Sequence, residues 1–214
     1  MPDFVITPVY RVEELAPSAR EAARAWGRQH VVPDDWHECV VDHFEQICTI
    51  IGVDLATRPL RLYGGGTRQV PCVHFSGFAS QGDGASFEGS YRYAPRSAAK
   101  IRAYAPDEVE LHRIADTLAG VQRRNFYQLE ASVRQQGRYC HEYTMAIRVE
   151  RASPTGQATT PTAEYDVTEA LSDLARWLYR RLEGEYDYQT SDAEVDAAFH
   201  ANDYTFTERG ARFP

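Results

Sequence analysis

The sequence lacks any long apolar run. None of its hydrophobic stretches approaches the roughly 18 residues that a transmembrane helix needs, so we expect no membrane span. The N-terminus, Met1-Pro2-Asp3-Phe4-Val5-Ile6, also lacks the basic and apolar regions of a secretory signal peptide. With 43% hydrophobic and 25% charged residues, the composition is that of an ordinary globular protein. These features predict a soluble protein of the cytoplasm.

Patterns typical of metal sites are absent as well. The four cysteines form no C-x-x-C pair and are expected to be free, mostly buried thiols. They are Cys39, Cys48, Cys72 and Cys140. His37-Glu38 resembles the start of a zinc-protease motif, but His43 follows six residues after His37 instead of four, on a different helix face. We therefore expect no metal ion and no cofactor.

Negative charge is unevenly distributed along the chain. Residues 164–203 contain eleven acidic residues against three arginines, a balance of −8 that equals the net charge of the whole chain. Nucleic-acid binding needs a basic surface that neutralises phosphates, so this segment disfavours it. A partner protein with a basic surface would suit the segment. A solvated helical face accounts for the same charges without any partner.

Helical and strand periodicities alternate irregularly along the chain. Helical stripes are predicted after Pro33, from Pro106 to Val133, and after Asp166. Strand patterns fill most of residues 60–104, and residues 139–150 alternate with a period of two. This order predicts a single α+β domain over residues 1–214, an antiparallel sheet with helices packed on one face. We expect residues 1–30 to form an N-terminal helical segment and residues 163–214 to form an acidic helical C-terminal part.

The stretch from Ser76 to Tyr91 has the most unusual composition. It contains four glycines, four serines and three aromatic residues, and almost no aliphatic side chains. Asp83-Gly84 is a strong signal for a two-residue turn, because both central positions of a type I′ turn need positive φ. A hairpin centred there would place Phe78 opposite Gly89 and His74 opposite Tyr93.

Three catalytic or nucleotide-binding motifs can be excluded in this region. The segment from Gly77 to Gly82 is one residue too long for a nucleophile elbow, and a strand instead of a helix follows it. No helix follows Gly82-Asp83-Gly84, as a dinucleotide fingerprint requires, and Gly64-Gly65-Gly66 lacks the lysine of a phosphate-binding loop.

A ligand pocket on the face of the sheet remains a candidate site. His141 is predicted on the covered face of its own strand, and its proximity to His74 would create a pair able to bind a metal or move protons. The candidate residues are His74, Ser76, Ser80, Asp83, Glu88 and His141. The structural alternative is that the aromatic residues pair across strands and the serines form local hydrogen bonds.

The acidic segment carries a second candidate site, a protein-binding surface. Tyrosine interleaved with acidic residues suits an interface, since Tyr provides contact area with few torsions to immobilise. The candidate residues are Tyr179, Glu183, Glu185, Tyr186, Asp187 and Tyr188. The alternative is that these aromatic residues pack the final helix onto its neighbours.

Several segments share the pattern of a known family. The most specific is S-G-F-x-S-Q-G-D-G-A-S-F-E-G, and the others are Trp36-His37-Glu38, Leu111 to Ala115, Arg124 to Tyr127 and Ala170 to Gly210. Over about residues 30–210 the chain resembles a family encoded by bacteriophages and prophages, commonly labelled "antitoxin of toxin-antitoxin stability system". The resemblance implies phage origin, and we carry over no catalytic residue from it.

These observations favour a non-enzymatic accessory protein of a phage or mobile element. It would bind and inhibit a toxin, a defence protein or another protein in the host cytoplasm, one that presents a basic surface. The alternative is a small-molecule-binding protein or hydrolase with a pocket near Ser76–Tyr91. Direct nucleic-acid binding and membrane association are not expected, and the sequence leaves a homodimer open.

Overall fold

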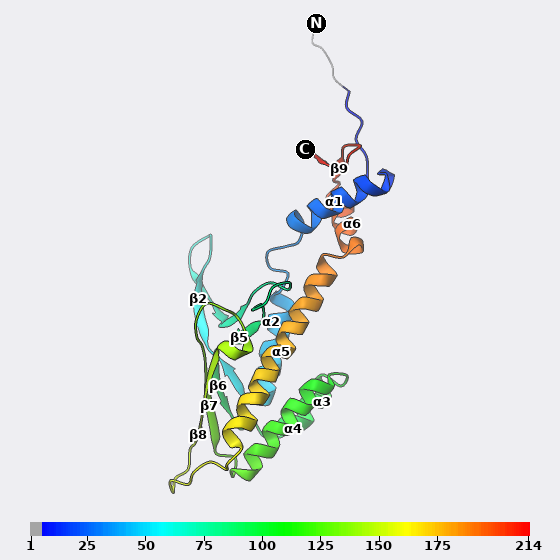
Figure 1. The fold of residues 1–214 in the computed structure, drawn as a ribbon. Helices are drawn as coiled ribbons and strands as arrows, with labels where there is room; N and C mark the ends of the chain where they lie inside the picture. The colour runs from blue at the N-terminus through cyan, green and yellow to red at the C-terminus, as the bar shows by residue number, and fades with distance from the viewer. Residues whose placement is uncertain (1–5) are drawn as a thin grey trace. The chain divides into compact units, whose positions relative to one another are not determined.

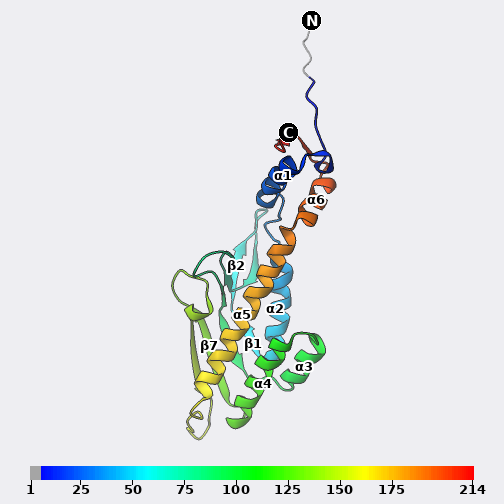
Figure 2. The same ribbon diagram turned by 45° about the vertical axis from the view of Figure 1, so that its right-hand side comes forward.

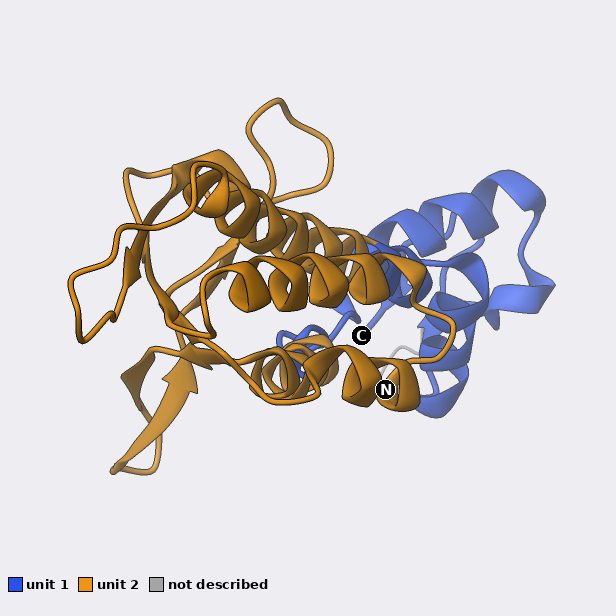
Figure 3. Ribbon diagram, turned by 90° about the horizontal axis from the view of Figure 1, so that it is seen from below, with its two compact units in different colours: residues 1–38, 184–214 blue, residues 39–183 orange. Residues whose placement is uncertain are grey.

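The computed structural model describes residues 6–214. Its contacts group the chain into two compact units (Figure 3). The central unit contains residues 39–183, and the terminal unit contains residues 6–38 and 184–214 of the described chain. No helix within the described residues is long and apolar enough to cross a membrane.

The central unit is built on a four-stranded antiparallel sheet with strand order β1-β6-β7-β8. Its strands are β1 (Val53–Leu55), β6 (Gly89–Arg92), β7 (Leu129–Gln135) and β8 (Met145–Arg151). Odd-numbered residues face inward: in β7, Leu129, Ala131 and Val133 are buried whereas the residues between them are exposed. This period-two burial means that one face of the sheet is covered and the other is open.

Two further hairpins extend from the central unit. One pairs β2 (Thr57–Arg61) with β3 (Thr67–Pro71), and the other pairs β4 (Val73–Phe75) with β5 (Ala85–Phe87). Every residue of β2 is exposed, whereas every residue of β5 is buried. The second hairpin is therefore part of the core.

Helices cover one face of the sheet, as the sequence predicted (Figures 1 and 2). The central unit contains α3 (Ser97–Tyr104), α4 (Val109–Arg124), most of α2 (Glu38–Ile51) and the part of α5 (Ala163–Gln189) up to Glu183. Their apolar stripes are fully buried, and the Phe44 ring of α2 lies 5.5 Å from the Phe87 ring of β5. The α+β class is confirmed.

The terminal unit has its own small core. It contains a 3₁₀ turn η1 (Val12–Glu14), α1 (Pro17–His30), α6 (Asp192–Ala201), and the short strands β9 (Thr205–Phe206) and β10 (Arg212–Phe213). The core residues are Val12, Leu15, Ala19, Ala23, Val195, Phe199 and Phe206. Helices α1 and α6 approach closely at Gly27, where an added Cβ would lie 2.5 Å from Phe199 Cζ.

The sequence placed Leu129 and Val133 in the helix that begins near Pro106, and this prediction was wrong. Helix α4 ends at Arg124 because Phe126 and Tyr127 both have positive φ, 56° and 61°. The Gln128 N–H donates to the Asn125 carbonyl and closes the turn. The buried Gln122 side chain then binds both the N–H and the carbonyl of Leu129, so β7 starts there.

Candidate functional site

The stretch from Ser76 to Tyr91 does not form the predicted hairpin. His74 lies opposite Ser86 instead of Tyr93, and Gly89 lies opposite Leu55 and Val133, not Phe78. Residues 76–84 form a longer loop between β4 and β5, and β6 belongs to a different sheet from β4. The prediction of a two-residue turn at Asp83-Gly84 was therefore wrong.

The side chain of Asp83 explains why the turn is longer. Its Oδ2 accepts hydrogen bonds from the backbone N–H of Ser80 at 2.6 Å and of Ala79 at 3.0 Å. Positive φ falls on Gly82, at 101°, and not on Asp83 or Gly84. The carboxylate thus organises the loop by accepting two backbone N–H groups that precede it in the chain. These hydrogen bonds, from Ser80 and then Ala79, lower the pKa of Asp83.

A glycine is needed at position 84 because another segment packs closely against it, and not because the turn requires positive φ there. An added Cβ at this position would lie 2.7 Å from the carbonyl oxygen of Cys140 and 3.1 Å from Cδ2 of His141. The loop that carries His141 therefore rests directly on the backbone at Gly84, and a larger residue would displace it.

His74 has an acidic partner. Its Nε2 lies 3.2 Å from Oε1 of Glu88, and about a third or less of each side chain is exposed. This ring nitrogen can donate a hydrogen bond to the carboxylate. The pair therefore joins two polar side chains of the predicted pocket, one from β4 and one from the residue before β6.

His141 was predicted on the covered face of a strand, and this prediction was also wrong. Strand β8 starts only at Met145, and His141 instead caps the 3₁₀ turn η2 (Glu142–Thr144). Its Nδ1 lies 3.3 Å from the backbone N of Tyr143, a donor, and 2.9 Å from Oε2 of Glu142, an acceptor. A single ring nitrogen cannot both accept a hydrogen bond from Tyr143 and donate one to Glu142, so only one of these two hydrogen bonds forms at a time.

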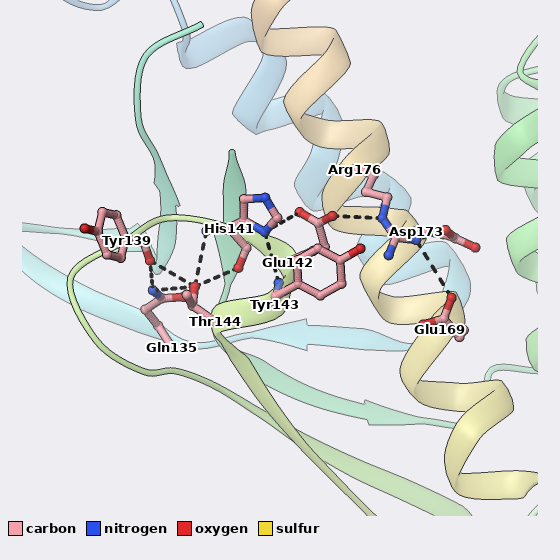
Figure 4. Close-up of polar contacts among 9 residues, drawn as sticks. All are labelled: Gln135, Tyr139, His141, Glu142, Tyr143, Thr144, Glu169, Asp173 and Arg176. Atoms are coloured by element: carbon pink, nitrogen blue, oxygen red, sulfur yellow. Dashed lines mark hydrogen bonds and ion pairs between the residues drawn. The ribbon is translucent and has the colours of Figure 1, made fainter. Parts of the chain in front are cut away.

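The surroundings of His141 tie the loop after β7 to helix α5 (Figure 4). Glu142 accepts a hydrogen bond from Arg176 Nε at 3.0 Å, and Arg176 also binds Asp173 at 2.5 Å. On the other side, Thr144 Oγ1 contacts the Gln135 side chain at 2.9 Å and the His141 carbonyl at 2.7 Å. The network anchors the loop, which is a structural role.

The structure thus divides the six pocket candidates among three local clusters. His74 contacts Glu88; Ser76, Ser80 and Asp83 belong to one loop; and His141 lies beside Gly84. No hydrogen bond or ion pair in the described part of the chain joins His74 to His141. A metal site is not formed either, because no group of three or more His, Cys, Asp or Glu side chains within residues 6–214 could hold a metal ion.

The cysteines are free thiols, as predicted, but only Cys48 is buried. Burial raises the pKa of Cys48, and it is the main cause that raises the pKa of Cys72 and Cys140. Such thiols stay protonated and are poor nucleophiles at neutral pH.

Part of the predicted protein-binding surface belongs to the central unit. Tyr179 donates a hydrogen bond to the Gly77 carbonyl at 3.0 Å, and its ring stacks on Phe78 at 5.5 Å. Burial, followed by the nearby carboxylates of Glu183 and Asp83, raises the pKa of Tyr179. Tyr179 therefore holds the 76–84 loop, a contact that sequence spacing does not reveal.

The other four predicted binding residues lie in the terminal unit, in the last turns of α5. Asp187 and Tyr188 are exposed, and 55% of Tyr188 is accessible. A hydrogen bond to the Glu194 carboxylate raises the pKa of Tyr188. Glu185 accepts a hydrogen bond from Gln189, and Tyr186 packs its ring 5.5 Å from Trp36. Aromatic and acidic groups thus share one helix end.

The residues that line the open face of the sheet were not predicted from the sequence. Two shallow depressions of about 280 and 460 Å³ lie on it and share Ser90 and Ser132. Charged residues surround these serines: Asp54, Glu88, Arg92, Glu130, Arg134, Arg148 and Glu150. The sequence does alternate between apolar and polar residues along β7, which is the pattern of a strand with one open face. This pattern was missed because residues 129–133 were predicted to be helical.

The fold and these contacts define an α+β protein whose helices cover one face of an antiparallel sheet, with no assembled catalytic cluster among the six pocket candidates. The chain belongs to the family described as "Domain of unknown function (DUF8835)", whose model matches residues 36–192. No curated protein and no solved structure matches the chain. The family match includes the whole central unit and leaves residues 6–35 and 193–214 outside it.

Proposed function

We propose that this protein acts without catalysis, by binding a partner protein that presents a basic surface. The binding surface is the acidic terminal unit, and in particular the last turns of α5 around Asp187 and Tyr188. The observation that carries the proposal is the separation of charge between the two units.

The terminal unit contains 13 acidic residues and six arginines among its described residues, a net charge of −7. The central unit contains 17 of each sign and is neutral. Within the terminal unit, three of the arginines already pair with carboxylates: Arg11 binds Asp203, Arg24 binds Asp192 and Asp196, and Arg28 binds Glu21 and Asp192. A field of one sign attracts a partner of the opposite sign and accelerates its association.

Three exposed carboxylates support a surface that can accept cations from a partner. Asp34, Asp35 and Asp187 are exposed and have no cationic partner among the described residues. Tyr188 adds an exposed aromatic ring in the same unit. Acidic groups provide charge complementarity, and tyrosine provides contact area at low entropic cost.

The resemblance to phage-encoded antitoxin-labelled proteins supports a more specific version. In this version the protein is an accessory factor of a phage or mobile element, and the partner is a toxin or a defence protein of the host cell. Stoichiometric binding would inhibit the partner directly.

The test uses the intact protein as bait in host-cell lysate, followed by titration of each purified captured protein. Replacing the three free carboxylates in D34N/D35N/D187N should weaken binding at least tenfold, and raising the salt concentration should weaken wild-type binding. The matched control D42N/D107N/E164Q neutralises three carboxylates of the central unit and should leave affinity unchanged. Equal affinity for wild type and D34N/D35N/D187N would overturn the proposal.

The sheet-face depressions favour a second candidate, a small-molecule-binding protein. Glu88 belongs both to the predicted pocket and to the depression of about 460 Å³. The test is a thermal-shift screen with charged metabolites on wild type and on Ser132→Trp, which fills the depressions. A compound that stabilises wild type but not the Trp variant would support this candidate. A screen in which no compound stabilises wild type would exclude it.

A further inference from the structure

Strand β8 forms an edge of the four-stranded sheet, since within residues 6–214 it pairs only with β7 (Figure 1). An edge strand presents unpaired N–H and carbonyl groups that can pair with another chain. The sequence of β8 is Met-Ala-Ile-Arg-Val-Glu-Arg, with neither proline nor glycine to block such pairing.

The hydrogen-bond pattern shows which residues of β8 face outward. The N–H of Gln136 donates to Thr144 and the N–H of Ala152 donates to Gln128, so even-numbered residues exchange bonds with β7. The odd-numbered residues therefore direct their backbone groups to the open edge. Among the described residues, the N–H groups of Ile147 and Val149 have no partner.

The side chains of β8 also match a role at an interface. Ile147 and Val149 are only half-buried, although they point to the helix-covered face of the sheet. On the open face, the side chains of Arg148 and Glu150 are 81% and 64% exposed and form an ion pair at 2.8 Å. On its open face the edge thus carries one charge of each sign, and not a row of like charges that would repel another copy.

We propose that β8 pairs antiparallel with β8 of a second copy, with the two-fold axis at Val149. The backbone groups allow only registers that place outward-facing residues opposite each other. An axis at Ile147 would place Arg148 opposite Ala146, and an axis at Arg148 would bring the two arginines together. An axis at Val149 places Arg148 opposite Glu150 twice, which is the electrostatically favourable choice.

In this arrangement each Val149 exchanges both backbone bonds with Val149 of the second copy. Each Ile147 does the same with Arg151 of the second copy, and the sheet continues through both molecules. A single strand pair is a small interface, so we expect a weak dimer that forms with rising concentration. Closed two-fold pairing leaves no free β8 edge for further growth.

Sedimentation measurements on the full chain from about 1 µM to 1 mM, a range chosen for weak interfaces, test the proposal. Wild type should shift from monomer to dimer. R148E and E150R should each weaken the dimer at least tenfold, because like charges then face each other. A mixture of R148E with E150R should dimerise again, as should R148E/E150R alone, because both combinations restore opposite charges at both positions.

Two control variants test whether the dimer forms through the β8 edge in this register. R134E changes an arginine on the same open face but one strand further in, and should leave the dimer unchanged. Val149→Pro removes an outward N–H that β7 does not use, so it should abolish the dimer while the fold is retained. A wild type that stays monomeric at every concentration, or a mixture of R148E with E150R that stays monomeric, would overturn the proposal.

Discussion

The terminal and central units differ in charge, in core and in family membership. The central unit is neutral, contains the whole four-stranded sheet and lies entirely within the family match. The terminal unit carries a charge of −7 in its described residues, has a core of seven buried residues, and lies mostly outside the match. The family match thus includes the main fold, whereas the net negative charge of the described residues lies in the terminal unit, partly inside and partly outside the match.

The largest expected effect is on the core of the central unit. Phe44→Ala removes a ring that is completely buried and packs on Phe87. It should lower the free energy of unfolding of this unit by about 3–5 kcal/mol. Hydrogen exchange with mass spectrometry should show lost protection in α2 and β5, with protection in α1 and α6 retained. Equal loss in all four elements would show that the units unfold together.

The complementary change acts on the terminal unit. Gly27→Ala places a methyl group 2.5 Å from Phe199 Cζ and 2.6 Å from Val195 Cγ1, so these two side chains or the helices that carry them must shift. Overpacking of this kind costs about 1–3 kcal/mol, and exchange should rise in these two helices only. The matched control is Gly184→Ala, where no atom lies within 4 Å of an added Cβ. That change should stabilise α5 by about 0.5–1 kcal/mol.

A stabilising change is expected at the turn after α4. Phe126 is 69% exposed and has a φ of 56°, a conformation that costs a bulky residue of order 1–3 kcal/mol. Phe126→Asn should relieve part of this strain and raise the melting temperature of the central unit, by a few degrees for about 1 kcal/mol. Tyr165→Asn, an exposed helical aromatic residue without positive φ, is the control. A lower melting temperature for Phe126→Asn would contradict the strain argument.

The smallest effect concerns pH and the 76–84 loop. Because two backbone N–H groups lower the pKa of Asp83, its carboxylate stabilises the fold above the ordinary aspartate pKa of 3.8. This contribution is lost as pH falls through the lowered pKa of the folded state. The amide resonances of Ala79 and Ser80 should shift in that range, below pH 3.8, and D83N should remove the shift. Resonances of α6 amides provide a reference in the other unit.

Local sequence patterns predicted the structure correctly where interactions within a single element determine it. Ser191 and Glu194 have the three-residue spacing of a helix N-cap, and the Ser191 side chain accepts the Glu194 N–H at the start of α6. The apolar stripe after Asp166 became the buried face of α5. The cap is a contact within four residues, and the stripe follows the helical period, so sequence spacing encodes both directly.

The same reasoning failed where a distant segment decides. Leu129 and Val133 have helical spacing, but pairing with β6 and β8 makes them a strand. Asp83-Gly84 has the composition of a tight turn, but the Asp83 carboxylate and the loop at His141 impose a longer one. Among the six pocket candidates, His74 and Glu88 are the two that lie far apart in the sequence and still form a side-chain contact.

Composition and short-range periodicity were sufficient to predict the α+β class, the positions of the main helical stripes and the concentration of negative charge toward the C-terminus. Four features depend instead on the folded chain: the strand order, the loop held by Asp83 and Tyr179, the open polar face of the sheet and the unpaired edge of β8. Strand pairing joins residues far apart in the chain, so neither the partner of a strand nor its free edge can be read from local spacing.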